Sequence, residues 1–226
     1  MTRLSLNRLR LYGALASMIN AATAICAVFV LSATPTSAAE RATVLALGDS
    51  LVAGYGLPKE ESFPAVLEAE LKALGHDVRV INGGVSGDTS KAGLSRVDWL
   101  FAEKPDLMLL ELGANDGLRG LPPEDTERNL AQIIEKSQAA GVPVLLTGML
   151  APPNMGRDYG EAFNALYPRL AEKYGTAFYP FFLDGVAAEP ELNQGDGMHP
   201  NAAGVEIIAR RIAPSVIDAL AAGTGS

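Results

Sequence analysis

Short apolar runs alternate along the chain with stretches whose apolar residues recur at helical spacing. The runs predict strands at residues 43–47, 78–81, 106–112, 142–147 and 177–181. Helical spacing predicts helices between and after them at residues 60–74, 90–102, 124–140, 159–174 and 201–220. Strands that alternate with helices through short turns are typical of a parallel sheet with helices on both faces. The pattern therefore predicts an α/β protein, a three-layer α/β/α sandwich around a five-stranded parallel sheet.

The first predicted strand runs directly into the turn Gly48-Asp49-Ser50-Leu51. Glycine at position 48 permits a sharp turn, so we expect Ser50 at the carboxyl end of the strand. Ligands bind at that edge in open α/β sheets. Most serines after a strand are helix N-caps, so Ser50 alone does not predict a nucleophile. We interpret Asp49 as support for the turn rather than as one of a catalytic pair of carboxylates.

The first 39 residues differ from the rest of the chain. Basic residues precede an apolar run at residues 21–32, and the small residues 37–39 resemble a signal-peptidase site. An uncleaved anchor is the alternative, but polar residues leave the run short of the ~20 residues that span a bilayer. We expect a cleaved signal peptide over residues 1–39 and one domain over residues 40–226. The protein would be exported, periplasmic or secreted, with no stable membrane anchor.

Composition and charge narrow the expected partners. Of the 226 residues, 48% are hydrophobic, which suffices for one well-packed domain. The net charge is −8, and loss of the first 39 residues, with three arginines and no acid, brings it to −11. A domain this acidic, without a basic block, is a poor partner for nucleic acid or anionic membranes. The only cysteine, Cys26, lies in the predicted signal peptide, which leaves few ligands for zinc.

The chain contains only two histidines that could serve as a base. His76 lies in a turn between a predicted helix and strand, at the edge opposite Ser50. His199 lies in the loop before the last helix, at the same edge as Ser50, where it can serve as the base that a serine nucleophile needs. Asp196, three residues earlier, can accept a hydrogen bond from the imidazole. The alternative for Asp196 is an Asx-turn residue that bonds its own backbone.

Two further loops offer hydrogen-bond donors for a developing oxyanion. Gly87 lies in the predicted loop 82–89, where the lack of a side chain lets its N–H approach a substrate closely. Asn115 follows the third strand, and its amide can point into a cleft at the same edge. Each residue alone is better interpreted as a turn residue. Together with Ser50 and His199 they predict an acyl-transfer site.

Taken together, these motifs resemble those of a known family. Gly48-Asp49-Ser50-Leu51, Gly87, Gly113-x-Asn115-Asp116 and Asp196-x-x-His199 resemble the ordered blocks of the SGNH hydrolases, also called GDSL esterases and lipases. The resemblance extends over nearly the whole chain after the signal peptide. Three segments are also similar to the periplasmic thioesterase I, lysophospholipase L1 and arylesterase subgroup: residues 86–90, 111–120 and 161–164.

The resemblance implies a flavodoxin-like fold with strand order 2-1-3-4-5 and neither a metal nor an organic cofactor. It implies that Ser50 is the nucleophile, His199 the general base and then acid, and Asp196 its orienting partner. The N–H groups of Ser50 and Gly87 and the amide of Asn115 would form the oxyanion hole.

One segment departs from the subgroup pattern. Asn82-Gly83-Gly84 is richer in glycine than the corresponding segment usually is. We expect the extra glycine to loosen the loop that carries Gly87. Such a change bears on substrate preference more than on the chemistry.

The expected function is that of a serine esterase acting on carboxylic esters or thioesters of small or lipid-like acyl groups. Candidate substrate-binding residues are apolar and favour acyl chains: Leu118, Leu121, Met149 and Leu150. A carbohydrate O-deacetylase with the same catalytic residues is the alternative, and it would need a polar, aromatic-lined cleft. A non-catalytic exported binding protein is a third interpretation, but it would lack a member of the triad. The sequence leaves the oligomeric state open.

Overall fold

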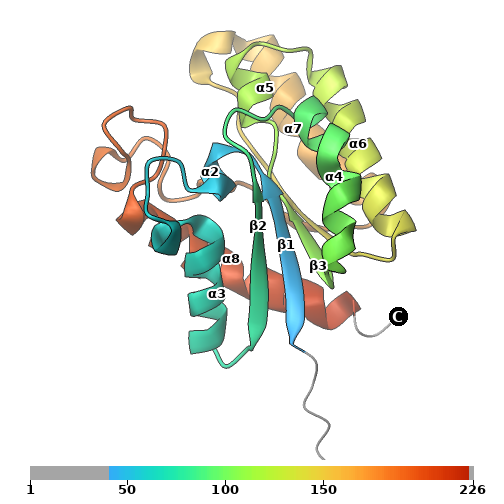
Figure 1. The fold of residues 1–226 in the computed structure, drawn as a ribbon. Coiled ribbons are helices and arrows are strands. Elements are labelled where there is room, and N and C mark those ends of the chain that lie inside the picture. Colours follow the sequence, from blue (N-terminus) through green and yellow to red (C-terminus); the bar gives the residue numbers. More distant parts are fainter. Residues whose placement is uncertain (1–40, 224–226) are drawn as a thin grey trace, which may run out of the picture. The chain divides into compact units, whose positions relative to one another are not determined.

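A five-stranded parallel sheet forms the centre of the computed structural model, which describes residues 41–223 (Figure 1). The strands are β1 (Ala42–Gly48), β2 (Val78–Gly84), β3 (Leu107–Leu110), β4 (Val144–Thr147) and β5 (Ala177–Tyr179). Their order in the sheet is β2-β1-β3-β4-β5, and every pairing is parallel. The predicted fold class and strand order are therefore confirmed. The predicted signal peptide lies outside the described residues.

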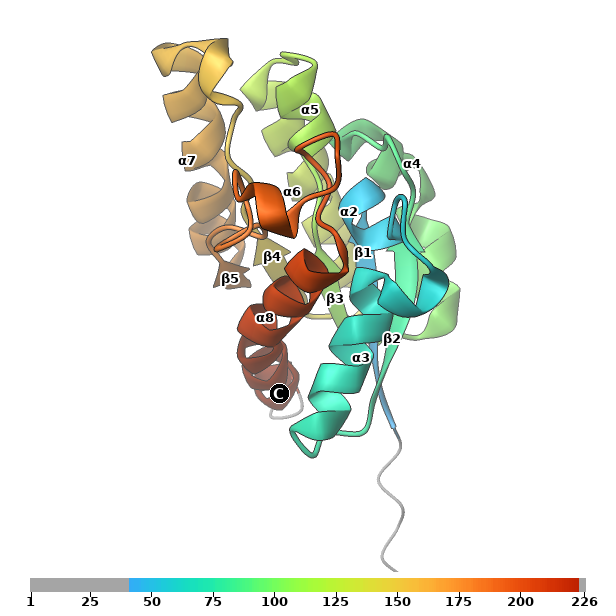
Figure 2. The same cartoon turned by 90° about the vertical axis from the view of Figure 1, so that its left-hand side faces the viewer.

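Helices cover both faces of the sheet. They are α2 (Ser50–Ala53), α3 (Phe63–Ala73), α4 (Ser90–Leu100), α5 (Ala114–Leu118), α6 (Pro123–Ala139), α7 (Arg157–Tyr174) and α8 (Ala202–Gly223). Helices α3 and α8 pack together on one face, and α4, α6 and α7 cover the other (Figures 1 and 2). Short 3₁₀ turns lie at Lys59–Glu61, Phe101–Glu103, Pro153–Met155 and Pro190–Leu192. None of the helices within residues 41–223 is long and apolar enough to cross a membrane.

The central strands are apolar on both faces because helices cover both faces. Val44–Leu47 of β1 and Leu107–Leu110 of β3 have no exposed surface. Across the α3 face, Phe63 packs edge to face against Phe182, with ring centroids 4.9 Å apart. Strand β1 lies between β2 and β3, so the turn that follows it starts from a buried strand inside the sheet.

Strand β2 is longer than the sequence predicts. Instead of starting a loop, residues 82–84 pair with residues 46–48 of β1. The glycines in this segment serve close packing, since a Cβ on Gly84 would lie 2.2 Å from the backbone nitrogen of Ala53. The expectation that they loosen the following loop is therefore wrong, because they join β2 tightly to the Ser50 turn.

The role of Gly48 also differs from the prediction. This residue continues β1 and does not adopt the left-handed conformation. A Cβ at this position would lie 2.3 Å from Cγ2 of Val52 and 2.5 Å from Oε2 of Glu111. The turn itself begins at Asp49, whose φ and ψ are −103° and −138°. Glycine is therefore required at position 48 by close packing rather than by backbone conformation.

Several element boundaries differ from the predicted ones. The sequence does not predict helices α2 and α5, which follow β1 and β3. Both are too short to show helical periodicity in the sequence. Helix α3 begins at Phe63, with Pro64 in its first turn, because proline is favoured there. Asn201 caps α8 as predicted: its Oδ1 accepts the N–H of Gly204 at 3.1 Å.

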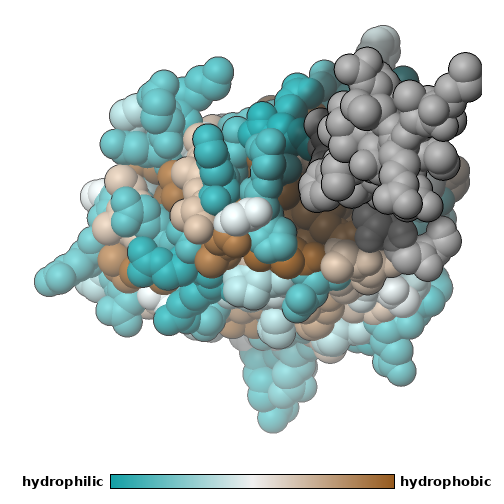
Figure 3. Space-filling model, turned by 90° about the horizontal axis from the view of Figure 1, so that it is seen from below, coloured by the Kyte–Doolittle hydropathy of each residue, from teal (hydrophilic) through white to brown (hydrophobic). Residues whose placement is uncertain are grey.

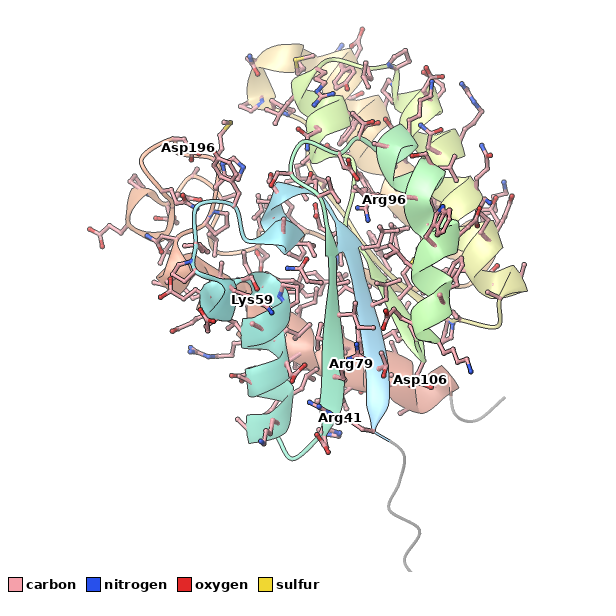
Figure 4. The ribbon with its side chains drawn as sticks, viewed as in Figure 1. Arg41, Lys59, Arg79, Arg96, Asp106 and Asp196 are labelled. Carbon is pink, nitrogen blue, oxygen red and sulfur yellow. The ribbon has the colours of Figure 1, made fainter. Side chains whose placement is uncertain are left out.

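The edge opposite the Ser50 turn is held by polar contacts. Arg41 forms an ion pair with Glu68 at 2.8 Å, and Asp106 accepts the backbone N–H of Thr43 at 2.7 Å. Figure 4 shows Arg41, Arg79 and Asp106 together at this lower edge. Viewed from below, hydrophilic residues surround hydrophobic ones on this part of the molecule (Figure 3). His76 is exposed in the turn between α3 and β2, so it lies away from Ser50, as predicted.

Candidate active site

Ser50, Asp196 and His199 meet at the carboxyl edge of the sheet. Ser50 is the first residue of α2, directly after the Asp49 turn. Asp196 and His199 lie in the loop before α8, and Figure 4 shows Asp196 at the upper edge of the molecule. A backbone hydrogen bond from Gln194 N–H to His199 O, 2.7 Å long, closes this loop on itself. The topology therefore joins the start and the end of the described chain in one site.

The three side chains form a continuous hydrogen-bonded chain. Nε2 of His199 lies 3.0 Å from Oγ of Ser50, and Nδ1 lies 2.6 Å from Oδ2 of Asp196. The backbone N–H groups of His199 and Met198, followed by the imidazole, lower the pKa of Asp196 to about 2. An ionised Asp196 can only accept, so Nδ1 of His199 carries a proton, and in the neutral imidazole Nε2 is then an acceptor for the serine hydroxyl. The geometry is that of a nucleophile with its base.

Asp196 combines the two roles that the sequence left as alternatives. Its Oδ1 accepts the backbone N–H groups of Met198 at 2.9 Å and His199 at 3.0 Å, which forms the turn. Its Oδ2 accepts from the imidazole. One carboxylate thus shapes the loop and holds the imidazole of His199.

Three candidate oxyanion donors surround Ser50. Gly87 adopts a φ of 86°, which glycine tolerates, and within residues 41–223 its N–H donates to no acceptor. The same is true of the N–H of Ser50. The amide of Asn115 is already engaged, because Nδ2 donates to Oδ2 of Asp49 and to the carbonyl of Asp88, both at 3.0 Å. Asn115 is therefore held in place before any substrate arrives.

Two arginines hold the loop that carries Gly87. Arg96 on α4 donates from Nε to Oδ2 of Asp88 at 2.7 Å and from a terminal nitrogen to the carbonyl of Gly48 at 3.0 Å. Figure 4 places Arg96 close to the upper end of β1. Arg119 donates to the carbonyl of Gly87 at 2.9 Å. These contacts join the Gly87 loop to the Ser50 turn and to α5.

A pair of buried carboxyl groups lies beneath the Ser50 turn. Asp49 and Glu111 are both 0% exposed. Oδ1 of Asp49 accepts the N–H of Leu51 at 3.0 Å, which confirms that Asp49 supports the turn. Oε2 of Glu111 accepts the N–H of Asp49 at 3.2 Å. The pair connects the end of β3 with the residue before the serine.

An aromatic ring covers the imidazole. The ring of Tyr55 lies 4.5 Å from the ring of His199, centroid to centroid, at an angle of 36°. The carbonyl of Tyr55 accepts a hydrogen bond from Nε2 of Gln194 at 2.7 Å, which joins the α2 turn to the His199 loop. Tyr55 itself is 53% exposed. The contact places an apolar surface against one face of the base.

The candidate substrate-binding residues differ in exposure. Leu118 is 54% and Leu150 is 49% exposed, so both side chains present apolar surface to solvent. Leu121 is half-buried, and its carbonyl accepts from the hydroxyl of Tyr159 at 2.9 Å. Met149 is only 3% exposed, so it offers a substrate little surface. The exposed leucines are the better candidates for direct contact.

The sequence did not identify Tyr55, Arg96, Arg119 or Glu111 as part of this site. A single acidic residue at the end of an apolar strand was the available signal for Glu111. The arginines give no such signal, because basic residues on helices are usually solvated. Within the described range, no group of three His, Cys, Asp or Glu side chains could hold a metal ion.

A serine, a histidine and an aspartate linked by hydrogen bonds at the ligand-binding edge of a parallel sheet define the class of serine hydrolases. Comparison with known proteins identifies the family. The model of the GDSL-like lipase/acylhydrolase family matches residues 46–207. The chain therefore belongs to this family, as the resemblance of its motifs predicted.

Named relatives share much of the chain. An arylesterase of Vibrio mimicus is 44% identical over 184 residues, covering 80% of this chain and 92% of that protein. Thioesterase 1/protease 1/lysophospholipase L1 of Escherichia coli K12 is 43% identical over 165 residues, covering 73% of this chain and 78% of that protein. The chain in the crystal structure of TesA is 43% identical in sequence, with a TM-score of 0.73. The match covers 77% of this chain and 97% of that chain.

The chain in the crystal structure of AlinE4, an SGNH-hydrolase family esterase, is 49% identical in sequence, with a TM-score of 0.68. The match covers 80% of this chain and 97% of that chain. The fold, the family and these relatives agree on the type of reaction. The protein is an ester-hydrolysing enzyme, and small-molecule esters are its substrates.

Proposed function

We propose that the enzyme hydrolyses carboxylic esters or thioesters by two-step acyl transfer, with Ser50 as nucleophile, His199 as base and acid, and Asp196 as the orienting carboxylate. The observation that carries this proposal is the hydrogen-bonded chain from Ser50 Oγ through His199 to Asp196, with spacings of 3.0 and 2.6 Å. Such spacings allow a proton to move between serine and imidazole without rearrangement.

In the first step, Ser50 Oγ attacks the ester carbonyl carbon while its proton passes to Nε2 of His199. The tetrahedral intermediate collapses, and the imidazolium gives this proton to the departing alcohol or thiol. In the second step, His199 takes a proton from water, whose oxygen attacks the acyl-enzyme. Collapse of the second intermediate returns the proton to Ser50 and releases the acid. Asp196 stabilises the imidazolium in both steps.

The developing oxyanion is stabilised by the N–H groups of Ser50 and Gly87 and by the amide of Asn115. The first two have no acceptor among the described residues, so they are available to the oxyanion without loss of an existing bond. The N–H of Asn115 that donates to the Asp88 carbonyl is shared with the substrate oxygen, while the other N–H keeps its bond to Asp49. Arg96 and Arg119 keep the Gly87 loop in position.

Exposed leucines favour substrates with an acyl chain. Leu118 and Leu150 are about half exposed, with Leu121 half-buried. Their burial by a substrate chain would contribute roughly 25 cal/mol for each Å² of apolar surface. The names of the relatives add thioesters and lysophospholipids to the substrates worth testing. We propose an acyl esterase rather than a carbohydrate O-deacetylase for this reason.

The test is a substrate panel with the purified protein and two variants. The panel contains p-nitrophenyl esters of increasing chain length, an acyl-CoA, a lysophospholipid and an acetylated sugar. Ser50→Ala should abolish hydrolysis without changing the melting temperature, whereas Ser95→Ala, an exposed serine on α4, should retain full activity. Activity in Ser50→Ala would exclude the proposed nucleophile. Hydrolysis of the acetylated sugar alone would favour the deacetylase.

We further propose that residues 1–39 are a signal peptide and that the mature domain is exported. The features that support this are the basic start, the apolar run and the small residues before Glu40. Expression of the full chain in a bacterium, followed by fractionation and mass measurement, tests it. The expected product is a periplasmic or secreted form that begins near Glu40, and a full-length cytoplasmic form would contradict the proposal.

A further inference from the structure

A fully buried acid beneath the Ser50 turn takes no part in the steps above. Glu111 follows β3, is 0% exposed, and accepts one hydrogen bond, from the N–H of Asp49 at 3.2 Å to Oε2. Its Oε1 is buried without any hydrogen-bond partner among the described residues. An ionised carboxylate in such surroundings is very costly, so the group takes up a proton instead. Glu111 is therefore a neutral carboxylic acid.

The other carboxyl group of the pair has the donors that Glu111 lacks. Oδ1 of Asp49 accepts the N–H of Leu51, and Oδ2 accepts an N–H of Asn115, each at 3.0 Å. Burial raises the pKa of Asp49 to about 6, and the bonds from Leu51 and Asn115 limit the rise. Burial, and then the charge of Asp49, raise the pKa of Glu111 well above its ordinary value. The pair therefore holds one proton and one negative charge, with the charge on Asp49.

We propose that Glu111 is a positioning residue for Asn115, acting through Asp49 as the neutral member of a carboxyl–carboxylate pair. Neutral Glu111 fixes the backbone of Asp49 and leaves the Asp49 carboxylate as a charged acceptor for one N–H of Asn115. Because the amide group is planar, holding one N–H fixes the direction of the other. This inference rests on the proposed role of Asn115 as an oxyanion donor.

The location of the pair supports the same role. Asp49 lies between Gly48 and Ser50, so any shift of its backbone moves the nucleophile as well. A Cβ on Gly48 would lie 2.5 Å from Oε2 of Glu111, which shows how closely the acid packs under the turn. Asp88 and His199 are the other titratable groups that act on Asp49. Tyr167, whose side chain is also buried, is a further titratable group near Glu111.

The test compares two substitutions of Glu111 in hydrolysis of a p-nitrophenyl ester. Glu111→Leu removes both oxygens and should lower kcat about 10- to 100-fold, with KM changed less than about twofold, because the oxyanion donor acts mainly in the transition state. Glu111→Gln keeps a neutral donor and acceptor of the same shape and should stay within about threefold of the wild type. Ser137→Ala, which removes a buried hydrogen bond far from the site, should leave kcat unchanged.

A double-mutant cycle shows whether Glu111 acts through Asn115. Asn115→Ala should lower kcat by about 10²–10³, and Glu111→Leu should then have little further effect in that background. Equal effects of Glu111→Leu with and without Asn115 would overturn the proposal, as would a Gln variant as impaired as the Leu variant. If Glu111→Leu does not fold, Asp49→Asn provides the same cycle from the other member of the pair.

The outcomes separate this inference from the proposed function. Unchanged kcat in Asn115→Ala would refute the oxyanion role on which the inference rests. A large loss in Asn115→Ala, together with unchanged kcat in both Glu111→Leu and Asp49→Asn, would refute the positioning role alone.

Discussion

At the scale of single residues, the imidazole of His199, the proposed base, has contacts on three sides. Asp196 bonds Nδ1, Ser50 faces Nε2, and the ring of Tyr55 lies 4.5 Å away against one face. The imidazole therefore needs no rotation to pass a proton from the serine to the leaving group. Each contact restricts a different motion of the ring, so the three can be tested separately.

Removal of the negative charge from Asp196 should damage the base while the loop persists. Asp196→Asn can still accept the backbone N–H groups of Met198 and His199, but its amide opposes the Nδ1 proton. We expect kcat to fall by about 10²–10⁴ with little change in KM, because the imidazolium loses its partner and its tautomer. Asp98→Asn, an exposed acid paired with Lys136, is the control. A kcat within about threefold of the wild type would contradict the role of Asp196.

Removal of the Tyr55 ring should affect the base more mildly. Tyr55→Ala removes the ring that packs against one face of His199, so the imidazole is held less firmly in the orientation that faces Ser50. We expect kcat to fall about 3- to 10-fold, because a base that must be reoriented reaches the transition state less often. Steady-state hydrolysis of a p-nitrophenyl ester measures this, and Trp99→Ala, an exposed aromatic on α4, is the control. An unchanged kcat would show that the Tyr55 ring does not hold the imidazole.

The meeting of Ser50, His199 and Asp196 at one edge of the sheet could be predicted, because it depends on residue type and order along the chain. Ser50, His199 and Asp196 fall in loops whose edge is fixed by the alternation of strands and helices. The hydrogen bond between Asp49 and Glu111 could not be predicted, because it joins residues 62 positions apart across two strands. Residue types give no register between strands, and that register places the two acids together.

At the scale of elements, the strand ends are packed more tightly than their glycines suggest. The sequence predicts a flexible segment at residues 82–84, but the chain there continues β2 against β1. Glycine permits both flexibility and close contact, so its presence alone cannot decide between them. The short helices α2 and α5 were missed for a related reason, since their few residues carry no periodic signal.

Alanine at two glycine positions should have opposite effects on stability. Gly48→Ala places a methyl group 2.3 Å from Val52, so it should destabilise the fold by more than about 1 kcal/mol and disturb the Ser50 turn. Gly160→Ala in α7 meets no atom within 4 Å and should stabilise the fold by about 0.5–1 kcal/mol. Chemical denaturation of both variants measures this. Equal stability of the two would contradict the packing role of Gly48.

At the scale of the whole molecule, the buried acids make stability depend on pH. The folded chain raises the pKa of Asp49 from 3.8 to about 6 and that of Glu111 above 4.5. At pH values above the pKa that each acid has in the unfolded chain, the folded protein therefore binds more protons than the unfolded chain. The stabilisation that protonation gives is present at low pH and is lost as pH rises through the folded pKa values. Asp196, whose pKa is lowered to about 2, acts in the opposite direction at lower pH.

Glu111→Gln should reduce this dependence, because glutamine does not titrate. We expect the melting temperature of the variant, relative to the wild type, to increase as pH rises from about 5 to 8. Thermal unfolding followed by circular dichroism at several pH values measures the difference. Ser137→Ala should show a difference that does not vary with pH. A pH-independent difference for Glu111→Gln would mean that Glu111 has an ordinary pKa.

Ser50 and His199, whose side chains meet in the site, lie 149 residues apart along the chain. During synthesis the serine appears with the first strand, whereas the histidine emerges only just before α8, which then packs on α3. A growing chain therefore carries Ser50 well before it carries the imidazole that faces it. The pair of side chains is complete only when the loop before α8 has packed against the segment that follows Ser50.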